Sequence, residues 1–437
     1  MMSGYAAIDD WRPFTKQLEF VQSIYEQLKQ RLEETHDSID DPDVQSYASY
    51  IQYSLALYIS ILGKAGKYQK AFDAFHELDT DGPLAPHPKI YSAILLVLSD
   101  RTTIDAEDPK AIEKLVSDAK DIWRRQKRSL DRQPENNMVM GSVYAMIKIL
   151  SSSSQPSDHE LMYDILRDTC GLPRLGENEK EDRPPPSQTV SPTKWILQVT
   201  LDSCIAVHRP DLVVHYAQSV MDSPKLRPIL WAGHLSKLLR AHILLAKKEE
   251  RSPSSSRSEN AAEWVEWMVA KAPREKLMPN PSTIALALEL CHRCQDLPSA
   301  IRITRMILNS DVDSEGLPRG RSGFLLPKAW ENLFALARVA SPDEKRQCLQ
   351  LFDTHGGSVL DIWKSTSAVR GLEPSEKKAY VFIALHIVKM LRPVPFPPDH
   401  DAAELQAWFD IQYRAELFLK ENPAKKTGRY TKKKGSS

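Results

Sequence analysis

Two cysteines, a few acidic pairs and several basic clusters are the residues of this chain that could do chemistry. Cys291 and Cys294 form the one C-x-x-C pair of the sequence, with His292 between them. A structural zinc site needs two more cysteine or histidine ligands at suitable spacing, and no second C-x-x-C pair exists. Both cysteines fall on the apolar face of a predicted helix. We therefore interpret them as packing residues and predict no metal and no cofactor.

Residue patterns of the common catalytic sites are absent from the sequence. It contains no phosphate-binding glycine loop, no dinucleotide-binding glycine fingerprint, no H-E-x-x-H motif and no G-x-S-x-G motif. Acidic pairs such as Asp40-Asp41 and Glu33-Glu34 lie at predicted helix ends, where a carboxylate complements the helix dipole or faces water. We predict a protein that is not an enzyme, with no catalytic residue and no small-molecule substrate.

Basic clusters are the stronger candidates for a binding surface. The chain has 58 Lys+Arg and 58 Asp+Glu residues, so any contact with a nucleic acid must come from local patches. A solvated helix surface is the ordinary alternative for each internal cluster. The internal clusters are Arg124, Arg125, Lys127, Arg128 and Arg132; Lys237 with Arg240; and Arg302 with Arg305.

The C-terminal tail, "NPAKKTGRYTKKKGSS", contains basic residues without an acidic residue. Such a segment is predicted to be disordered by itself. Each cation would release counterions on meeting a phosphate, and Tyr430 could stack on a base. We therefore predict RNA contacts at Lys425, Lys426, Arg429, Lys432, Lys433 and Lys434.

The composition of the 437-residue chain is that of a soluble, core-forming protein, with 42% hydrophobic and 27% charged residues. Five scattered cysteines favour a reducing compartment over a disulfide scaffold. No apolar run approaches the roughly 18–20 residues of a membrane helix, so we predict no membrane insertion. The first residues, with Asp9 and Asp10, do not resemble a cleavable targeting peptide.

Helical periodicity dominates the sequence, and strand-like alternation is almost absent, which predicts an all-α fold. The clearest signal is "ILGKAGKYQKAFDAFHEL" (61–78), where two apolar helical faces meet at Gly66. Two helices joined so tightly are expected to pack antiparallel, and Ala71 is small where the backbones would approach most closely.

Weaker copies of this hairpin lie at 195–222 and 280–309, with turns at Pro210-Asp211 and Asp296-Leu297. Aligning their small residues places Ala71, His215 and Ala300 in register, a pattern typical of an uneven repeat array. We divide the chain into N-terminal helical repeats 1–170, a proline-rich linker 171–192, repeats 193–248, a serine-rich linker 249–260, repeats 261–391, a C-terminal helical region 392–421 and the disordered basic tail 422–437.

The unit at 52–87 resembles the pentatricopeptide repeat (PPR) family. The matching features are Lys64-Ala65-Gly66 before the second helix, Ala71 within it, "AFDAFHEL" in place of the family's A-x-x-L-F-x-x-M, and the proline-bearing exit "GPLAPHP". The rival tetratricopeptide repeat wants a small residue twelve positions before the conserved alanine, and this chain has Ile59 there.

This resemblance implies a right-handed superhelix whose first helices line a concave RNA-binding face. The family's main base-reading positions fall on Ala56, Ser92, Thr200 and Ala285, with His87 as the last residue of the first unit. Two of the four positions are alanines without a side-chain donor or acceptor. This departure from the family's pattern favours shape-based RNA contact over a literal base code.

The predicted fold is therefore an all-α, right-handed α-solenoid of about eight helical hairpins. By resemblance, we expect a non-catalytic RNA-binding protein of mitochondrial gene expression. It would act in mRNA maturation, stability or translation, or as a component associated with the mitochondrial ribosome. The expected partners are mitochondrial mRNA or rRNA and ribosomal or other complex proteins. The alternative is a helical-repeat protein–protein scaffold in a large complex, without sequence-specific RNA reading.

Overall fold

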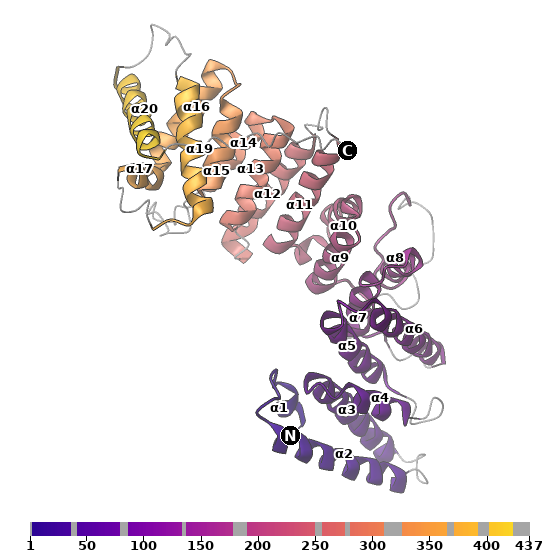
Figure 1. Ribbon diagram of the computed structural model, residues 1–437. Coiled ribbons are helices and arrows are strands. Elements are labelled where there is room, and N and C mark those ends of the chain that lie inside the picture. The colour runs from indigo at the N-terminus through magenta and orange to yellow at the C-terminus, as the bar shows by residue number, and fades with distance from the viewer. Residues whose placement is uncertain are drawn as a thin grey trace, which may run out of the picture. The chain divides into compact units, whose positions relative to one another are not determined.

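A computed structural model of the chain consists of α-helices in the part that it describes (Figure 1). The described residues are 2–35, 42–78, 86–132, 137–177, 190–249, 256–275, 280–309, 326–364, 371–391 and 402–422. Within these ranges the chain forms nineteen α-helices, one short 3-10 helix and no β-strand. The all-α prediction is confirmed.

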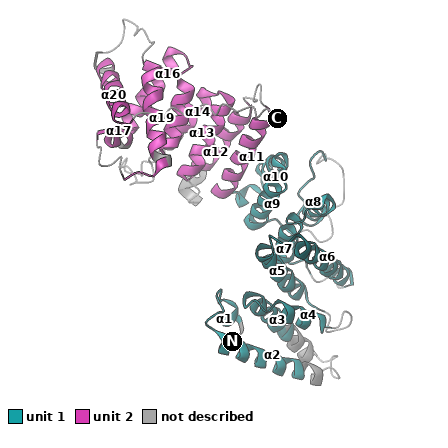
Figure 2. Cartoon of the chain, in the orientation of Figure 1, with its two compact units in different colours: residues 1–230 teal, residues 231–437 magenta. Residues whose placement is uncertain are grey.

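The chain divides into two compact units, residues 1–230 and residues 231–437 (Figure 2). The helices of unit 1 are α1 Met2–Ala6, α2 Thr15–Thr35, α3 Pro42–Lys64, α4 Tyr68–His76, α5 Pro88–Ile104, α6 Pro109–Arg132, α7 Met140–Ser151, α8 Pro156–Cys170, α9 Lys194–Ala206, α10 Pro210–Asp222 and the 3-10 helix η2 Arg227–Ile229. Those of unit 2 are α11 Ala232–Lys248, α12 Ser256–Glu275, α13 Pro281–Cys294, α14 Leu297–Asn309, α15 Pro327–Ala337, α16 Pro342–His355, α17 Gly357–Lys364, α19 Pro374–Leu391 and α20 Ala402–Glu421.

Unit 1 is organised by contacts between neighbouring helix pairs. Helix α3 packs on α5, α5 on α7 and α7 on α9, while α4, α6, α8 and α10 each pack on the helix that precedes them. We call α3, α5, α7 and α9 the first helices of unit 1 and their partners the second helices. Helix α5 lies between two other first helices and is correspondingly buried, with Ile90, Ile94 and Leu98 fully inaccessible. Burying one such side chain stabilises the fold by about 1.5–3 kcal/mol.

Unit 2 repeats this arrangement. Its first helices are α11, α13, α15 and α19, each of which packs on the next, and its second helices are α12, α14, α16 and α20. Here the second helices also contact one another, α12 with α14 and α14 with α16. The short helix α17 packs between α16 and α20. The described residues of each unit thus form four such pairs, and in unit 1 helices α1 and α2 also pack on α3.

Proline explains where many of these helices begin. Helices α3, α5, α6, α8, α10, α13, α15, α16 and α19 all start with proline, whose missing N–H costs nothing in the first turn. Polar caps add to this effect. The Asn280 side-chain oxygen accepts a hydrogen bond of 2.8 Å from the Thr283 N–H, and Ser341 forms a reciprocal capping box with Glu344.

The three predicted hairpins share one turn geometry. Gly66, His208 and Gln295 all adopt the left-handed conformation, with φ of 71°, 58° and 55°. In each hairpin the next residue donates its N–H to a carbonyl five residues earlier: Lys67 to Leu62 at 2.8 Å, Arg209 to Cys204 at 2.8 Å, and Asp296 to Cys291 at 3.0 Å. This is the Schellman motif that ends a helix.

The shared turn corrects the sequence alignment of the middle copy. Counting five residues from each left-handed position gives Ala71, Val213 and Ala300, all of which are fully buried. The predicted partner His215 is only half-buried, and its Nε2 lies 2.8 Å from the Pro173 carbonyl oxygen. The alignment with His215 is therefore wrong by two residues. Packing at this position requires a buried apolar side chain, and Val213 meets that requirement although it is larger than alanine.

The helix bounds can be set beside the predicted segments of the chain. Helix α8 ends at Cys170, where the sequence places the end of the N-terminal repeats. Helix α12 begins at Ser256, inside the range 249–260 that the sequence assigns to a linker. The division between the compact units falls after Leu230, inside the predicted segment 193–248, because η2 packs back on α10 whereas α11 packs on α12 and α13.

Candidate nucleic-acid interface

Packing leaves the first helices α3 and α9 of unit 1 with a narrow exposed stripe. On α3 this stripe includes Tyr50 and Tyr53, which are 61% and 43% exposed. On α9 it includes Trp195, which is 55% exposed, followed one turn later by Gln198. Large aromatic rings are therefore partly exposed on helices whose opposite side is buried.

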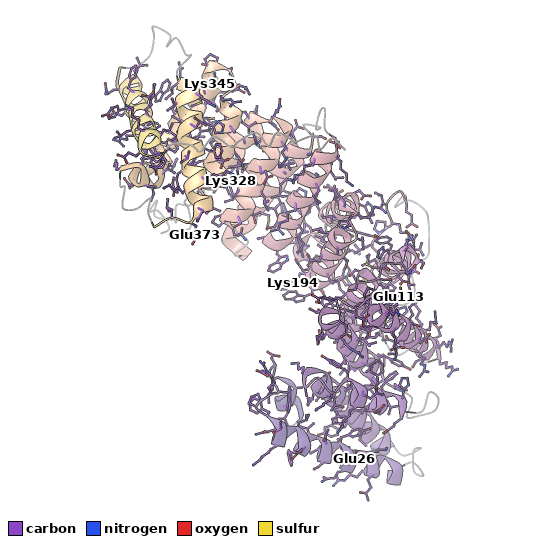
Figure 3. All side chains as sticks on the ribbon, viewed as in Figure 1. Glu26, Glu113, Lys194, Lys328, Lys345 and Glu373 are labelled. Atoms are coloured by element: carbon purple, nitrogen blue, oxygen red, sulfur yellow. The ribbon has the colours of Figure 1, made fainter. Side chains whose placement is uncertain are left out.

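Two of these rings, those of Tyr53 and Trp195, each have a lysine ammonium group over the ring. Lys89, near the start of α5, places its Nζ 4.8 Å from the ring centroid of Tyr53 on the neighbouring helix α3. Lys194 places its Nζ 5.1 Å from the ring centroid of the adjacent Trp195 (Figure 3). We call Tyr53, Lys89, Lys194 and Trp195 the aromatic–lysine edge of unit 1. Rings beside cations can stack on bases while the cations neutralise phosphates.

Unit 2 has a groove of about 620 Å³ between α15 and α19. Its lining includes Leu326, Pro327, Lys328, Glu331, Lys378 and Phe382. Lys378 lies over the ring of Phe382 at 5.8 Å, and Lys328 forms an ion pair of 2.8 Å with Glu331. We call this feature the α15–α19 groove. Like the aromatic–lysine edge of unit 1, it combines a lysine with an aromatic ring on first helices.

Further basic residues lie on the two helices that form this groove. Arg338 at the end of α15 and Lys378 and Lys389 on α19 are exposed, and none of them forms an ion pair within the described part of the chain. Burial, and secondarily the charges of Arg338, Lys389, His292 and Lys328, lower the pKa of His386 to about 4. These residues lie on α13, α15 and α19, of which α13 packs on α15 and α15 packs on α19.

Three of the four predicted base-reading positions are buried. Ala56 is 7% exposed, Ser92 is 6% exposed and Thr200 is inaccessible. The Thr200 hydroxyl donates a hydrogen bond of 2.8 Å to the Ile196 carbonyl oxygen of its own helix. The Ser92 hydroxyl faces α7, where a Cβ added to Gly141 would lie 2.3 Å from it. Both hydroxyls therefore lie within helix packing, and Ala285 is half-buried.

Counting back from the left-handed turn residue also changes one of the four predicted base-reading positions. Ten residues before the left-handed turn residue lie Ala56 in the first hairpin and Ala285 in the third, whereas the middle hairpin has Gln198 there and not Thr200. Gln198 is half-buried and donates a hydrogen bond of 3.0 Å to Asp202. Sequence reasoning missed it because it aligned the small residues of the second helices and placed the turn at Pro210-Asp211. The left-handed residue His208, which gives the correct register, is known only from the structure.

His87 has a structural role at the start of α5. Its Nδ1 accepts a hydrogen bond of 3.2 Å from the Lys89 N–H, which caps the helix ahead of Pro88. Burial first, and then the charge of Lys89, lower the pKa of the His87 side chain. The residue is thus held as a neutral cap beside the aromatic–lysine edge. Its predicted contact with RNA stays a prediction.

Most internal basic clusters lie on second helices. The cluster from Arg124 to Arg132 lies on α6, and Arg302 and Arg305 lie on α14, where Arg302 is 3.8 Å from Glu266. Arg125 lines a second groove, of about 380 Å³, together with Phe72, Lys114, Asp118 and Asp121. Like the lining of the α15–α19 groove, which includes Glu331, the lining of this groove is of mixed charge.

The cysteine pair packs as an apolar cluster. Cys291 is inaccessible and Cys294 is 8% exposed, and burial raises the pKa of both thiols. No group of three potential metal ligands occurs among the described residues. The predicted RNA contacts from Lys425 to Lys434 lie outside the described residues.

Comparisons with known proteins leave the family open. No protein-family model matches the chain, and a search of curated proteins gives no match either. In the described part of the chain, no helix combines the length and the apolar character needed to cross a lipid bilayer.

Proposed function

We propose that this chain is a non-catalytic RNA-binding protein of mitochondrial gene expression, built as a right-handed α-solenoid similar to PPR proteins. The order of contacts supports the solenoid, because within each unit every first helix packs on the next one in the chain. The handedness, the mitochondrial location and the role in mRNA maturation, stability or translation rest on the resemblance of residues 52–87 to that family.

The observation that best supports RNA as the ligand is the position of the pairs formed by a cation and an aromatic ring. Three of the four lysine– or arginine–aromatic pairs formed by the described residues lie on first helices: Lys89 with Tyr53, Lys194 with Trp195, and Lys378 with Phe382. Stacking of a base on an aromatic side chain contributes about 1–3 kcal/mol, and every base has a face that can stack. The neighbouring lysines add attraction to phosphate.

The proposed mode of binding is stacking and backbone contact, not base reading. The buried hydroxyls of Ser92 and Thr200 and the alanines at positions 56 and 285 offer a base few accessible donors or acceptors. Sequence discrimination by proteins depends on such groups contacting base edges. We therefore expect single-stranded RNA of different sequences to bind with similar affinity and with a strong dependence on salt.

The test is RNA binding by the intact chain over a series of salt concentrations. Replacing Tyr53 or Trp195 by alanine is expected to weaken binding by about 5- to 100-fold, the equivalent of one lost stacking contact. Replacing Lys89 by glutamine is expected to reduce the slope of log affinity against log salt by about one.

Two control variants match these changes on other surfaces. Tyr413→Ala removes an exposed ring from α20, and Lys114→Gln removes an exposed cation from α6. Both variants are expected to bind RNA as the unchanged chain does. Absence of salt-sensitive binding by the intact chain, or equal losses in the test and control variants, would refute the proposed RNA role.

A protein–protein scaffold is the second candidate, and helix α20 favours it. Phe409, Tyr413 and Leu417 follow one another at four-residue spacing and are 52%, 68% and 44% exposed. An apolar stripe of this kind suits a protein partner. Pull-down from a nuclease-treated mitochondrial extract separates the two candidates. Partners that survive nuclease and are lost with Tyr413→Ala support the scaffold, and partners that all disappear with the RNA exclude it.

A further inference from the structure

A groove separates the second helices α4 and α6 of unit 1. It has a volume of about 380 Å³ and is lined by α4, by α6 and by Arg101 of α5. We call it the α4–α6 groove. Helix α4 has nine residues and α6 has twenty-four, so α4 leaves much of α6 uncovered. In unit 2, by contrast, neighbouring second helices contact one another. The α4–α6 groove therefore lies where unit 2 has a contact between helices.

The groove combines an apolar floor with charges along α6. Phe72, Leu115 and Ile122 line it, and the last two are buried. Three charged side chains of α6 line it as well, and none of them forms an ion pair with another described residue. They are Lys114, Asp118 and Arg125. Steps of four and then seven residues return to within about 40° of the same direction around a helix. The charges thus lie on one side of α6 in the order positive, negative, positive.

Helix α20 carries the complementary pattern beside an exposed apolar stripe. Phe409, Tyr413 and Leu417 form this stripe and are 52%, 68% and 44% exposed. Three charged residues follow one flank of the stripe at the same steps of four and seven residues, and none forms an ion pair with another described residue. They are Asp410, Arg414 and Glu421. Their order is negative, positive, negative. The other side of α20 packs on α16, α17 and α19 of its own unit.

The two charge patterns agree in spacing and are opposite in sign. When α20 lies parallel to α6 in the α4–α6 groove, three ion pairs form between the two helices. They are Lys114 with Asp410, Asp118 with Arg414, and Arg125 with Glu421. In the antiparallel direction the steps of four and seven residues are reversed, so only one pair forms. The apolar stripe and the apolar floor meet beside these pairs, as in other complexes of an amphipathic helix with a groove.

We propose that α20 of one copy of this chain docks into the α4–α6 groove of a second copy. The apolar stripe supplies the buried contact, and the ion pairs fix the register and direction of α20. The inference does not depend on RNA binding. It goes beyond the proposed function by naming a second copy of the chain as the partner of the apolar stripe on α20.

The contact is heterologous, because it joins two different surfaces. Each copy has one groove in unit 1 and one α20 in unit 2, so a copy that fills the groove of one neighbour still offers its own groove to another. Such contacts build rings or open chains of subunits and do not stop at a dimer. Sedimentation velocity of the intact chain is expected to show association that increases from about 1 to 100 µM, the range of a small transient interface.

Charge reversal on either surface tests the pairing. The groove variant is Asp118→Lys/Arg125→Glu, and the helix variant is Arg414→Glu/Glu421→Lys. In each variant by itself, like charges face one another across the contact. Each is therefore expected to weaken self-association by about tenfold or more. Circular dichroism of each variant should match that of the unchanged chain, because all four substitutions replace charged side chains that are not buried.

An equal mixture of the two variants gives the decisive measurement. The reversed groove of one variant is complementary to the reversed α20 of the other, and the two unreversed surfaces are complementary as well. The mixture is therefore expected to associate as strongly as the unchanged chain, although neither variant does so by itself. This recovery separates a specific pairing from damage to the fold or a change in net charge.

A matched control reverses charges elsewhere on α6. Glu113→Lys/Arg128→Glu changes one acidic and one basic residue, both exposed and neither lining the groove, and should associate as the unchanged chain does. Tyr413→Ser, which changes only the apolar stripe, covers the case in which a charge-reversal variant does not fold. It is expected to weaken self-association by about fivefold or more.

Three results would overturn the proposal. They are a monomeric intact chain at about 100 µM, association of the reversal variants equal to that of the control, and a mixture that associates no better than its components. RNA affinities are compared at nanomolar chain concentration, where the chain is monomeric, so the controls Tyr413→Ala and Lys114→Gln are unaffected by self-association. RNA binding without self-association leaves the proposed function intact, and self-association without RNA binding leaves this inference intact.

Discussion

Burial at single residues decides which side chains of this chain are available for function. Thr200 and Ser92 carry hydroxyl groups at positions where the family resemblance expects base contacts, yet one is inaccessible and the other is 6% exposed. Trp195, by contrast, is more than half exposed on the same helix as Thr200. The exposed side chain is thus an aromatic ring, and the side chains that could hydrogen-bond to a base are buried. For this reason we propose that the chain stacks on bases and does not read them.

One buried histidine predicts how stability depends on pH. His242 on α11 is 3% exposed, and its Nδ1 has no hydrogen-bond partner within the described residues. Burial, with a smaller contribution from Arg257, lowers its pKa from 6.5 to about 4. The folded chain disfavours the protonated His242 ring, whereas the unfolded chain does not. The contribution of this ring to the free energy of unfolding is therefore fully present above pH 6.5 and is lost as the pH falls toward 4.

This linkage has a measurable size. Between pH 7.5 and pH 5.0, His242 is expected to reduce the free energy of unfolding by about 2 kcal/mol. Urea unfolding at both pH values checks this figure, and His242→Leu should remove that part of the pH dependence. If His242→Leu loses as much stability on acidification as the unchanged chain, the ring does not titrate as described.

The turns that join paired helices depend on only a few neighbouring residues. Gly66, His208 and Gln295 occupy the same left-handed position in three hairpins, but only the first is a glycine. A side chain in this conformation costs about 1–2 kcal/mol, because Cβ approaches the following carbonyl oxygen. The two later hairpins therefore have a strained residue where the first has none.

Substitutions at these turns are expected to act in opposite directions. Gln295→Gly and His208→Gly should each stabilise their own unit by about 0.5–1 kcal/mol, and Gly66→Ala should destabilise unit 1 by about 1 kcal/mol. The measurement is the shift in the urea midpoint of each unit. Gly4→Ala is the control, since an added Cβ there meets no atom within 4 Å. Destabilisation by both glycine substitutions would show that the turn conformation does not limit stability.

At the scale of the whole molecule, the division into two compact units predicts independent folding. Unit 1 ends where η2 packs back on α10, and unit 2 begins with α11, which packs on α12 and α13. Separate chains of residues 1–230 and 231–437 are each expected to unfold cooperatively. The sum of their far-ultraviolet circular dichroism should equal that of the intact chain. A coil-like spectrum from either fragment would mean that the unit needs its neighbour to fold.

Much of the candidate site lies beyond what sequence patterns can predict. The basic residues of the tail lie close together in the sequence, but Lys89, Lys194 and Lys378 of the candidate site are far apart and form no pattern along the chain. Likewise, the pairing of Lys89 with Tyr53 joins two helices of different hairpins. Such groupings depend on which helix faces meet, and a single sequence does not state this.

The sequence by itself determined the all-α fold and the approximate turns of the three predicted hairpins, near Gly66, Pro210 and Asp296. Those features depend on residues within one or two helical turns of each other, so local periodicity and backbone preference suffice. Only the tertiary structure decided the register of the middle hairpin, the burial of Ser92 and Thr200, and the pairing of Lys89 with Tyr53. The physical reason is that burial and charge proximity arise from packing between helices, whose contacts connect residues far apart along the chain.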